Sequence, residues 1–240
     1  MQSKKEIEKY IASKYVVDNL IFDDLIVGVG TGTTINIFIE LLSEKANTDD
    51  LNIICIPSSI ETKLRLIQKG LVVSDIIENS EIDIYIDGAD IVTEDNNLIK
   101  GGGGAMTMEK ILASSAQEFV VIVDSGKYPK NLLSYPVPVE IIPLAVNTVM
   151  KPLFDLGGEL KLRYGTGKIG PIVSDNGNVL GDVTFKKEYD PKIMEKAINN
   201  IPGIIENGLF PEKADKIVIG IDDSVKYIEI RRNKKNDYPT

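Results

Sequence analysis

Carboxylates, an amine and a run of glycines lie close together in the stretch from Asp87 to Glu109. Asp87 and Asp90 come first, Lys100 is followed by glycines at 101–104, and Glu109 closes the stretch. Carboxylates and amines move protons and stabilise developing charge. Glycines let the backbone turn with positive φ and approach a ligand closely. We interpret the stretch as a candidate active site in which the glycine loop, with Gly101, Gly102 and Gly103, wraps its amides around a ligand.

Structural explanations exist for each of these residues. An aspartate beside a glycine stabilises turns through its own backbone, a glycine run can be a linker, and a carboxylate in a first helical turn favours the helix dipole. A turn alone does not need two aspartates, Asp87 and Asp90, together with Lys100 downstream. A linker is rarely flanked by an apolar strand and a helix. A capping box at Glu109 would need Ser or Thr at position 106, which is Met106. The pattern therefore favours a catalytic role over a purely structural one.

A second glycine-rich loop, residues 28–34, reads Gly-Val-Gly-Thr-Gly-Thr-Thr. Thr33 replaces the third glycine of the dinucleotide fingerprint, and the chain has no P-loop motif. Free amides and hydroxyls at a helix start suit a phosphate, so Thr31, Gly32, Thr33 and Thr34 are candidate contacts. The alternative is a tight turn with an N-capping threonine.

Two further polar positions are weaker candidates. Ser58 and Ser59 are explained by helix capping alone. Lys127 follows an apolar run that ends at Asp124 and could contact an anion. Its alternative, a solvated surface lysine, is the commoner case.

Composition removes several classes of function. The 240 residues carry a net charge of -9, which disfavours general binding to nucleic acid or to anionic membranes. There is no histidine, which excludes Ser-His-Asp hydrolases and histidine-ligated metals. The single cysteine, Cys55, excludes an internal disulfide and a cysteine-based zinc site. No apolar run reaches membrane-spanning length, and residues 1–6 do not resemble a signal segment, so we expect a cytoplasmic protein.

The elements that must position these residues alternate between strand and helix. Apolar runs predict strands at 25–29, 51–56, 71–73, 82–86 and 119–123. Periodic stretches predict helices from the capping box Ser3–Glu6, over 35–42, from Ser58–Ser59 to 69, and over 106–117. Apolar strands alternating with helices indicate a parallel sheet covered on both faces. The candidate loops follow strand ends, where such sheets bind ligands.

The pattern changes near residue 136. Strands are predicted at 139–142 and 159–164, helices at 144–156 and 191–200, and a hairpin turn at Asp175-Asn176-Gly177-Asn178. We expect a small α+β domain at 135–206 inserted into an α/β domain formed by 1–134 and 207–240. The apolar strand 216–221 should return to the main sheet, and residues 231–240 should be frayed.

Together these motifs make the sequence similar to the A-type ribose-5-phosphate isomerase family. The resemblance covers the 28–34 loop, Asp-Gly-Ala-Asp at 87–90, Lys-Gly-Gly-Gly at 100–103, Glu109 and Lys127. It continues through Pro-Val-Glu at 138–140, the 175–178 turn and Ile-Pro-Gly at 201–203. Two positions depart from the family pattern: Ile91 replaces a common glutamate, and Gly126 replaces a common serine.

The resemblance implies a Rossmann-like parallel sheet covered by helices, with a smaller inserted α+β domain. It also implies interconversion of ribose 5-phosphate and ribulose 5-phosphate in the non-oxidative pentose phosphate pathway, without a metal or organic cofactor, in a homodimer or homotetramer. In the family, the glutamate that matches Glu109 accepts the proton. The positions that match Thr31–Thr34, Asp87–Asp90, Lys100–Gly103 and Lys127 contact the substrate.

The residues suggest a mechanism. We expect Glu109 to move the carbon proton, Lys100 and nearby amides to stabilise an enediolate oxyanion, and Asp87 and Asp90 to serve hydroxyl protons and ring opening. Which aspartate does which stays open. Competing hypotheses are an amino-sugar phosphate deaminase, a CoA transferase with a glutamate nucleophile, and a non-catalytic sugar-phosphate sensor.

Overall fold

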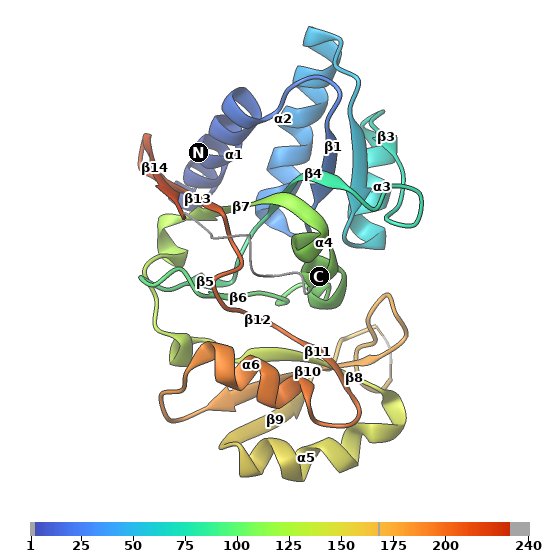
Figure 1. Ribbon diagram of the computed structural model, residues 1–240, viewed down its shortest axis with the longest axis vertical. Helices are drawn as coiled ribbons and strands as arrows, with labels where there is room; N and C mark the ends of the chain where they lie inside the picture. Colours follow the sequence, from blue (N-terminus) through green and yellow to red (C-terminus); the bar gives the residue numbers. More distant parts are fainter. Residues whose placement is uncertain (1–2, 168, 231–240) are drawn as a thin grey trace, which may run out of the picture.

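A seven-stranded sheet organises the larger part of the molecule (Figure 1). The structure is a computed structural model that describes residues 3–167 and 169–230. The strand order is β14-β13-β7-β4-β1-β2-β3. The strands are β1 (Ile26–Val29), β2 (Ile54–Pro57), β3 (Val72–Val73), β4 (Ile82–Asp87), β7 (Ala116–Asp124), β13 (Lys216–Ile221) and β14 (Ser224–Glu229).

Six of these strands are parallel, and their order is that of the Rossmann fold. The order reverses between β1 and β4, which pair directly, so the loops after these two strands flank the switch point where such sheets bind ligands. The predicted parallel sheet is confirmed, as is the return of residues 216–221 to it. The prediction missed β14, which pairs antiparallel to β13 at the edge.

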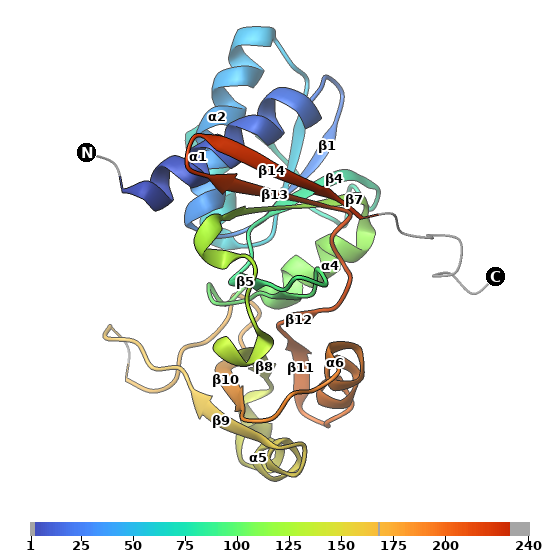
Figure 2. The ribbon, with the colours of Figure 1, turned by 90° about the vertical axis from the view of Figure 1, so that its left-hand side faces the viewer.

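Helices cover one face of this sheet. The helices are α1 (Lys4–Leu20), α2 (Thr33–Asp49) and α3 (Ile60–Gln68). Side chains such as Val16, Phe38 and Leu66 pack with Val27 and Ile122 in one buried cluster. Figure 2 shows α1 and α2 on the side of the sheet away from α4. Burial of this apolar surface is the main force that holds these layers together.

The other face is covered by α4 (Met106–Ser115) and by a small three-stranded sheet of β5 (Ile91–Val92), β6 (Leu98–Ile99) and β12 (Leu209–Phe210). Successive side chains of a strand point to opposite faces. Val92, Leu98 and Phe210 accordingly pack against the seven-stranded sheet, while Ile91, Ile99 and Leu209 pack against the remainder of the chain. The small sheet joins the two halves of the molecule (Figure 1).

The remaining elements form a four-stranded antiparallel sheet with two helices. They are β8 (Val137–Ile141), α5 (Val146–Asp155), β9 (Gly158–Leu162), β10 (Val179–Phe185), α6 (Pro191–Asn199) and β11 (Ile204–Asn207). Short 3-10 turns are η1 (Ser125–Lys127), η2 (Leu132–Ser134) and η3 (Pro143–Ala145). The expected domain boundary at 135 and 206 stays a prediction, and this sheet occupies the corresponding stretch.

Predictions that depend on interactions between residues close in the sequence are confirmed. Ser3 and Glu6 form the capping box, and Gly177 has φ of +82° in the predicted hairpin turn. The helix predicted over 35–42 is longer at both ends. The helix predicted over 106–117 ends at Ser115, because Ala116 already pairs with Ile82 in the sheet. Residues 231–240, expected to be frayed, lie outside the described residues.

Candidate active site

The loops after β1, β4, β6 and β7 line one cavity of about 390 Å³. Of the catalytic candidates, Asp90, Lys100 and Glu109 line it, whereas Asp87 lies behind Lys100 and does not. The predicted contacts that line it are Thr31, Gly32, Thr33, Thr34, Gly88, Ala89, Gly101, Gly102, Gly103 and Lys127. The structure thus brings together the predicted residues from Thr31 to Lys127 around one cavity.

Lys100 lies buried between two carboxylates. Its Nζ is 2.6 Å from Oδ2 of Asp87 and 3.2 Å from Oε2 of Glu109, and it donates to the carbonyl oxygen of Gly88 at 2.6 Å. A lysine ammonium has three protons, and two of these three contacts, those with Asp87 and Gly88, are hydrogen bonds. The contact with Glu109 has ion-pair distance without hydrogen-bond geometry, which leaves Oε2 of Glu109 without a hydrogen-bond partner.

Asp87 holds the loops together. Its Oδ1 accepts hydrogen bonds from the amides of Thr31 at 3.1 Å and Gly88 at 2.7 Å, and its Oδ2 accepts from the Tyr85 hydroxyl. A Cβ on Gly30 would lie 2.0 Å from Oδ1 of Asp87, so only glycine fits there. Asp87 therefore joins the β1 loop to the β4 loop and fixes Lys100.

The electrostatics of this cluster favour a strong base at Glu109. Burial raises the pKa of Glu109 to about 8, the negative charge of Asp87 adds to the rise, and Lys100 opposes it. Burial alone would lower the pKa of Lys100, but Asp87 and Glu109 outweigh it and raise that pKa. Lys100 stays charged, and Glu109 gains basicity near neutral pH, which suits proton transfer.

Glu109 is placed by the start of α4. Ala105 is the N-cap residue and provides no side-chain hydrogen bond, so the absence of a capping box is confirmed. Asp90 accepts a hydrogen bond from the Gly102 amide at 2.7 Å. The glycine loop closes on itself through Gly104 N–H and the Gly101 carbonyl, 2.9 Å apart.

The β1 loop leads directly into α2. Gly32 is the N-cap residue, with no side-chain cap, so the alternative of a capping threonine is wrong. The Thr31 hydroxyl contacts those of Ser58, Ser59 and Thr62 at 2.8–3.1 Å. Ser59 caps α3, as expected. Within the part of the chain that the structure describes, no side chain caps the start of α2, and its first-turn amides carry the positive end of the helix dipole.

Two lysines that the sequence reasoning missed line the same cavity. Lys5 and Lys9 come from α1, and Lys9 Nζ donates to Oγ1 of Thr33 at 2.8 Å. Lys127 lines the cavity from η1. The two missed lysines share one helix face at i, i+4 spacing, but nothing local in the sequence places α1 beside the β1 loop.

The two departures from the family pattern have structural settings. Ile91 is buried among the apolar side chains between the three-stranded sheet and the four-stranded sheet. The Gly126 amide donates to Oδ1 of Asp124 at 3.0 Å, and a Cβ at this position would lie 2.8 Å from the same oxygen. Neither position alters the contacts among Asp87, Lys100 and Glu109.

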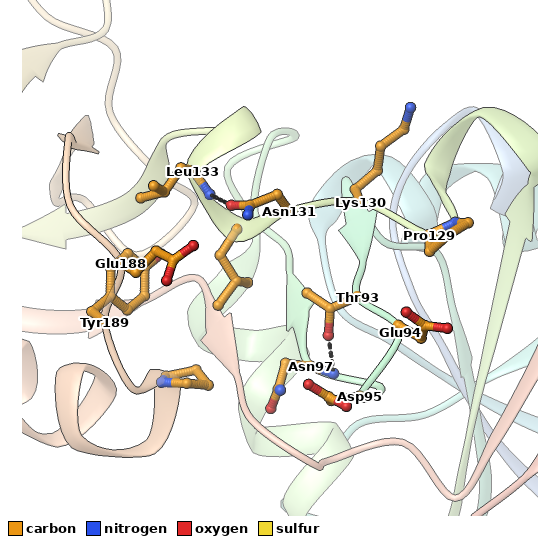
Figure 3. A pocket seen from close by; sticks show the side chains of 12 residues that line it. Thr93, Glu94, Asp95, Asn97, Pro129, Lys130, Asn131, Leu133, Glu188 and Tyr189 are labelled. Carbon is orange, nitrogen blue, oxygen red and sulfur yellow. Dashed lines mark hydrogen bonds between the residues drawn. The ribbon is translucent and has the colours of Figure 1, made fainter.

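A second, larger cavity of about 490 Å³ lies between the β5–β6 loop, residues 129–133 and residues 188–191 (Figure 3). Its charged side chains Glu94, Asp95, Lys130 and Glu188 are exposed. Thr93 and Asn131 accept hydrogen bonds from nearby backbone amides, those of Asn97 and Leu133. It lacks a buried pairing of lysine with carboxylates, so the smaller cavity is the candidate active site.

Comparison with known proteins agrees with this geometry. Residues 54–224 match the family model of ribose 5-phosphate isomerase A (phosphoriboisomerase A). The ribose-5-phosphate isomerase A of Methanothermobacter thermautotrophicus is 41% identical over 220 residues, which is 92% of this chain and 96% of the relative. The chain belongs to the ribose 5-phosphate isomerase A family. Its relatives are isomerases by name.

Solved structures of the family share the fold. The ribose 5-phosphate isomerase A of Methanocaldococcus jannaschii has a TM-score of 0.90 at 40% identity, covering 95% of this chain and all of that one. A D-ribose-5-phosphate isomerase in complex with phospho-erythronic acid has a TM-score of 0.91 at 39% identity, covering 96% and all, respectively. These coverages confirm the α/β fold with its additional antiparallel sheets over nearly the whole chain.

Within residues 3–167 and 169–230, no helix is long and apolar enough to cross a membrane. In the same residues, no group of three or more His, Cys, Asp and Glu side chains is arranged to hold a metal ion.

Proposed function

We propose that this protein interconverts ribose 5-phosphate and ribulose 5-phosphate through an enediolate, with Glu109 as the general base. The observation that carries the proposal is the buried Glu109 carboxyl beside Lys100, in a cavity that also holds three lysines and a helix N-terminus. A five-carbon sugar phosphate needs both kinds of group: a base for its carbonyl end and cations for its phosphate. The phospho-erythronic acid bound by a relative is a sugar-acid phosphate of similar kind.

In the proposed reaction, ionised Glu109 takes the proton from C-2 of the open-chain aldose. The electron pair left behind forms a carbon–carbon double bond with C-1, and the aldehyde oxygen becomes an oxyanion. Lys100 and the amides of Gly101–Gly103 stabilise that oxyanion. The C-2 hydroxyl then loses its proton and becomes the ketone, the C-1 oxygen gains a proton, and Glu109 returns its proton to C-1.

The two aspartates have different settings, which supports separate roles. Asp87 is fully buried and its oxygens already accept from Tyr85, Lys100 and two amides. We assign it the positioning of Lys100. Asp90 is half-buried and lines the cavity, so we assign it the hydroxyl protons and ring opening.

We assign the phosphate to the lysines and the helix start that line the same cavity. Lys5, Lys9 and Lys127 supply positive charge there, and the α2 amides at Thr33 and Thr34 supply donors. The expected homodimer or homotetramer, the cytoplasmic location and the role in the pentose phosphate pathway remain part of this proposal.

Turnover tests the proposal directly. Purified protein treated with EDTA is given ribose 5-phosphate, and the appearance of the ketose is followed. We expect conversion that continues without added metal. Binding of ribose 5-phosphate without conversion would instead support the sugar-phosphate sensor, and release of ammonia from glucosamine 6-phosphate would support the deaminase.

A further inference from the structure

Arg163 reaches from the four-stranded sheet to the glycine loop of the candidate site. It follows β9 directly, and its Nη1 donates to the carbonyl oxygens of Gly101 at 2.9 Å and Gly102 at 3.2 Å. These are two successive carbonyls of the loop that lines the cavity. Nothing in the sequence pattern connects position 163 with positions 101 and 102.

The guanidinium of Arg163 is itself held in place. Its Nε and Nη2 donate to the two carboxylate oxygens of Asp182 on β10, at 2.9 and 2.6 Å. The arginine side chain is only 15% exposed and the aspartate 28%. A two-pronged arginine–carboxylate pair fixes the plane of the guanidinium as well as its position. Nη1 is therefore a fixed donor.

This fixed donor determines the direction of the loop amides. In a trans peptide, the C=O and N–H bonds point in opposite directions. Since both carbonyls point toward Arg163, the amides of Gly102 and Gly103 point the other way. The Gly102 amide does so and donates to Oδ2 of Asp90, which lines the cavity. A hydrogen bond from a cation to a carbonyl also polarises the peptide and strengthens its N–H as a donor.

The backbone of the same loop is crowded at Gly102. A Cβ there would lie 2.5 Å from Oδ1 of Asp90 and 2.9 Å from the Tyr135 hydroxyl. Gly101, with φ of +95°, is crowded by Met106. Asp90 on one side and Arg163 on the other hold the two peptides between them.

We propose that Arg163, oriented by Asp182, is a positioning residue that holds the Gly102 amide on Asp90 and aims the Gly103 amide at the developing oxyanion. It acts through the loop and does not line the cavity among the described residues. The inference rests on the proposed isomerisation. It means that Arg163 and Asp182, which come from the four-stranded sheet, help to position the active-site loop.

The test compares Arg163→Met with Arg65→Met. Arg65 is a matched control, because its guanidinium pairs with Glu61 on the surface of α3, away from the residues that line the cavity. We expect Arg163→Met to lower kcat about 100-fold, the scale of a misplaced catalytic group, and to leave KM within about twofold, because transition-state contacts are lost and ground-state binding is not. Arg163→Lys should recover little, since a lysine offers a point charge instead of a fork. Arg65→Met should match the wild type.

A second readout does not depend on turnover. Amide hydrogen exchange of the segment 100–105 should be faster in Arg163→Met than in the wild type, with exchange in α2 unchanged. If Arg163→Met does not fold, Asp182→Asn replaces it, with an expected fall in kcat of about 10-fold. Folded variants with kcat within about threefold of the wild type, or with a raised KM alone, would overturn the proposal. A wild-type protein without turnover would refute the isomerisation. The amide hydrogen exchange of segment 100–105 would still decide whether Arg163 orients the loop.

Discussion

Glu109 is the residue whose chemistry depends most on its surroundings. Its carboxyl is buried beside the negative charge of Asp87, which raises its pKa to about 8 although Lys100 lies 3.2 Å away. As a base it works only when ionised, so kcat/KM should rise with pH through this pKa. Measured from about pH 6.5 to 9.5, the profile should climb by about tenfold per unit below the pKa and level off above it.

The rise of kcat/KM with pH can be separated from ionisation of the substrate. A sugar phosphate loses its second proton at about pH 6, so a rise in kcat/KM above neutral pH belongs to the protein. The raised pKa of Lys100 keeps that ammonium charged across the range. A profile that is flat or falls above neutral pH would show that Glu109 is ionised throughout or is not the base.

The lysines of the cavity should act on binding more than on chemistry. Lys9→Ala and Lys127→Ala each remove a cation from the proposed phosphate end. We expect KM for the sugar phosphate to rise about 10-fold for each, with kcat much less affected, as for loss of uniform binding. Lys63→Ala, an exposed position on α3, is the control. An unchanged KM in Lys127→Ala would remove that residue from the phosphate site.

Much of the site can be predicted from the sequence at this scale, because its residues fall in short motifs. Asp87, Asp90, Lys100 and Glu109 lie within one strand–loop–helix unit. Lys5, Lys9 and Arg163 could not be found this way, because their partners are brought to them by the tertiary fold.

Glu140 shows how one element positions another. This buried carboxylate on β8 accepts hydrogen bonds from Ser174 at 2.7 Å and Asn178 at 2.8 Å in the hairpin turn, and also from Asn176 and from Thr107 on α4. Burial would raise its pKa, but these donors lower it below the ordinary 4.5. It fixes the turn against the helix that carries Glu109.

Glu140→Gln should therefore destabilise the protein. The amide has one acceptor oxygen and brings its own N–H groups against four donors, so we expect a loss of about 1–3 kcal/mol in the free energy of unfolding. Because the folded pKa is lowered, the wild-type advantage is present above pH 4.5 and shrinks as the pH falls. Urea unfolding at several pH values measures this. Glu159→Gln, an exposed control, should change little, and an equal loss in both variants would contradict the account.

Helices, turns and strands could be predicted where the residues that specify them are close together in the sequence. Capping at Ser3, the turn at Gly177 and the apolar parallel strands all appear in the sequence. The strand β14 was missed, because Ser224–Glu229 is held by its pairing with β13 and only partly by apolar burial. The strands β5, β6 and β12 have two residues each, too short for a periodic pattern.

The three-stranded sheet lies between the two main cores and packs on both of them. Val92 packs on the core of the seven-stranded sheet, while its neighbour Ile91 packs on the core of the four-stranded sheet. Lys110 on α4 adds ion pairs to Glu195 and Glu206 at 3.0 and 2.7 Å. The two halves therefore share buried contacts on both sides of this sheet.

We accordingly expect one unfolding transition. Urea unfolding followed by circular dichroism and by tyrosine fluorescence should give coincident curves. The substitution Ile99→Ala, which opens the core on the side of the four-stranded sheet, should shift both curves together, with a loss of about 2–5 kcal/mol. Two separated transitions would show that the predicted domains at 135–206 and the remainder unfold independently.

The arrangement of these sheets relative to each other was beyond the sequence, because it depends on contacts between distant segments. The resemblance to the family implies a Rossmann-like main sheet, and the pairing of β1 with β4 belongs to the strand order of that fold. The joining sheet and the hydrogen bonds of Arg163 to the glycine loop form only when both halves are folded.

The central claim is that Glu109 moves a carbon-bound proton. The decisive measurement is exchange of that proton with solvent deuterium, followed by NMR on ribose 5-phosphate and ribulose 5-phosphate in the presence of wild-type protein or Glu109→Gln. We predict that the variant stays folded, since an amide replaces a buried carboxyl with a raised pKa, and that its exchange and turnover fall by roughly 10³-fold. Exchange at the wild-type rate in folded Glu109→Gln would contradict the account.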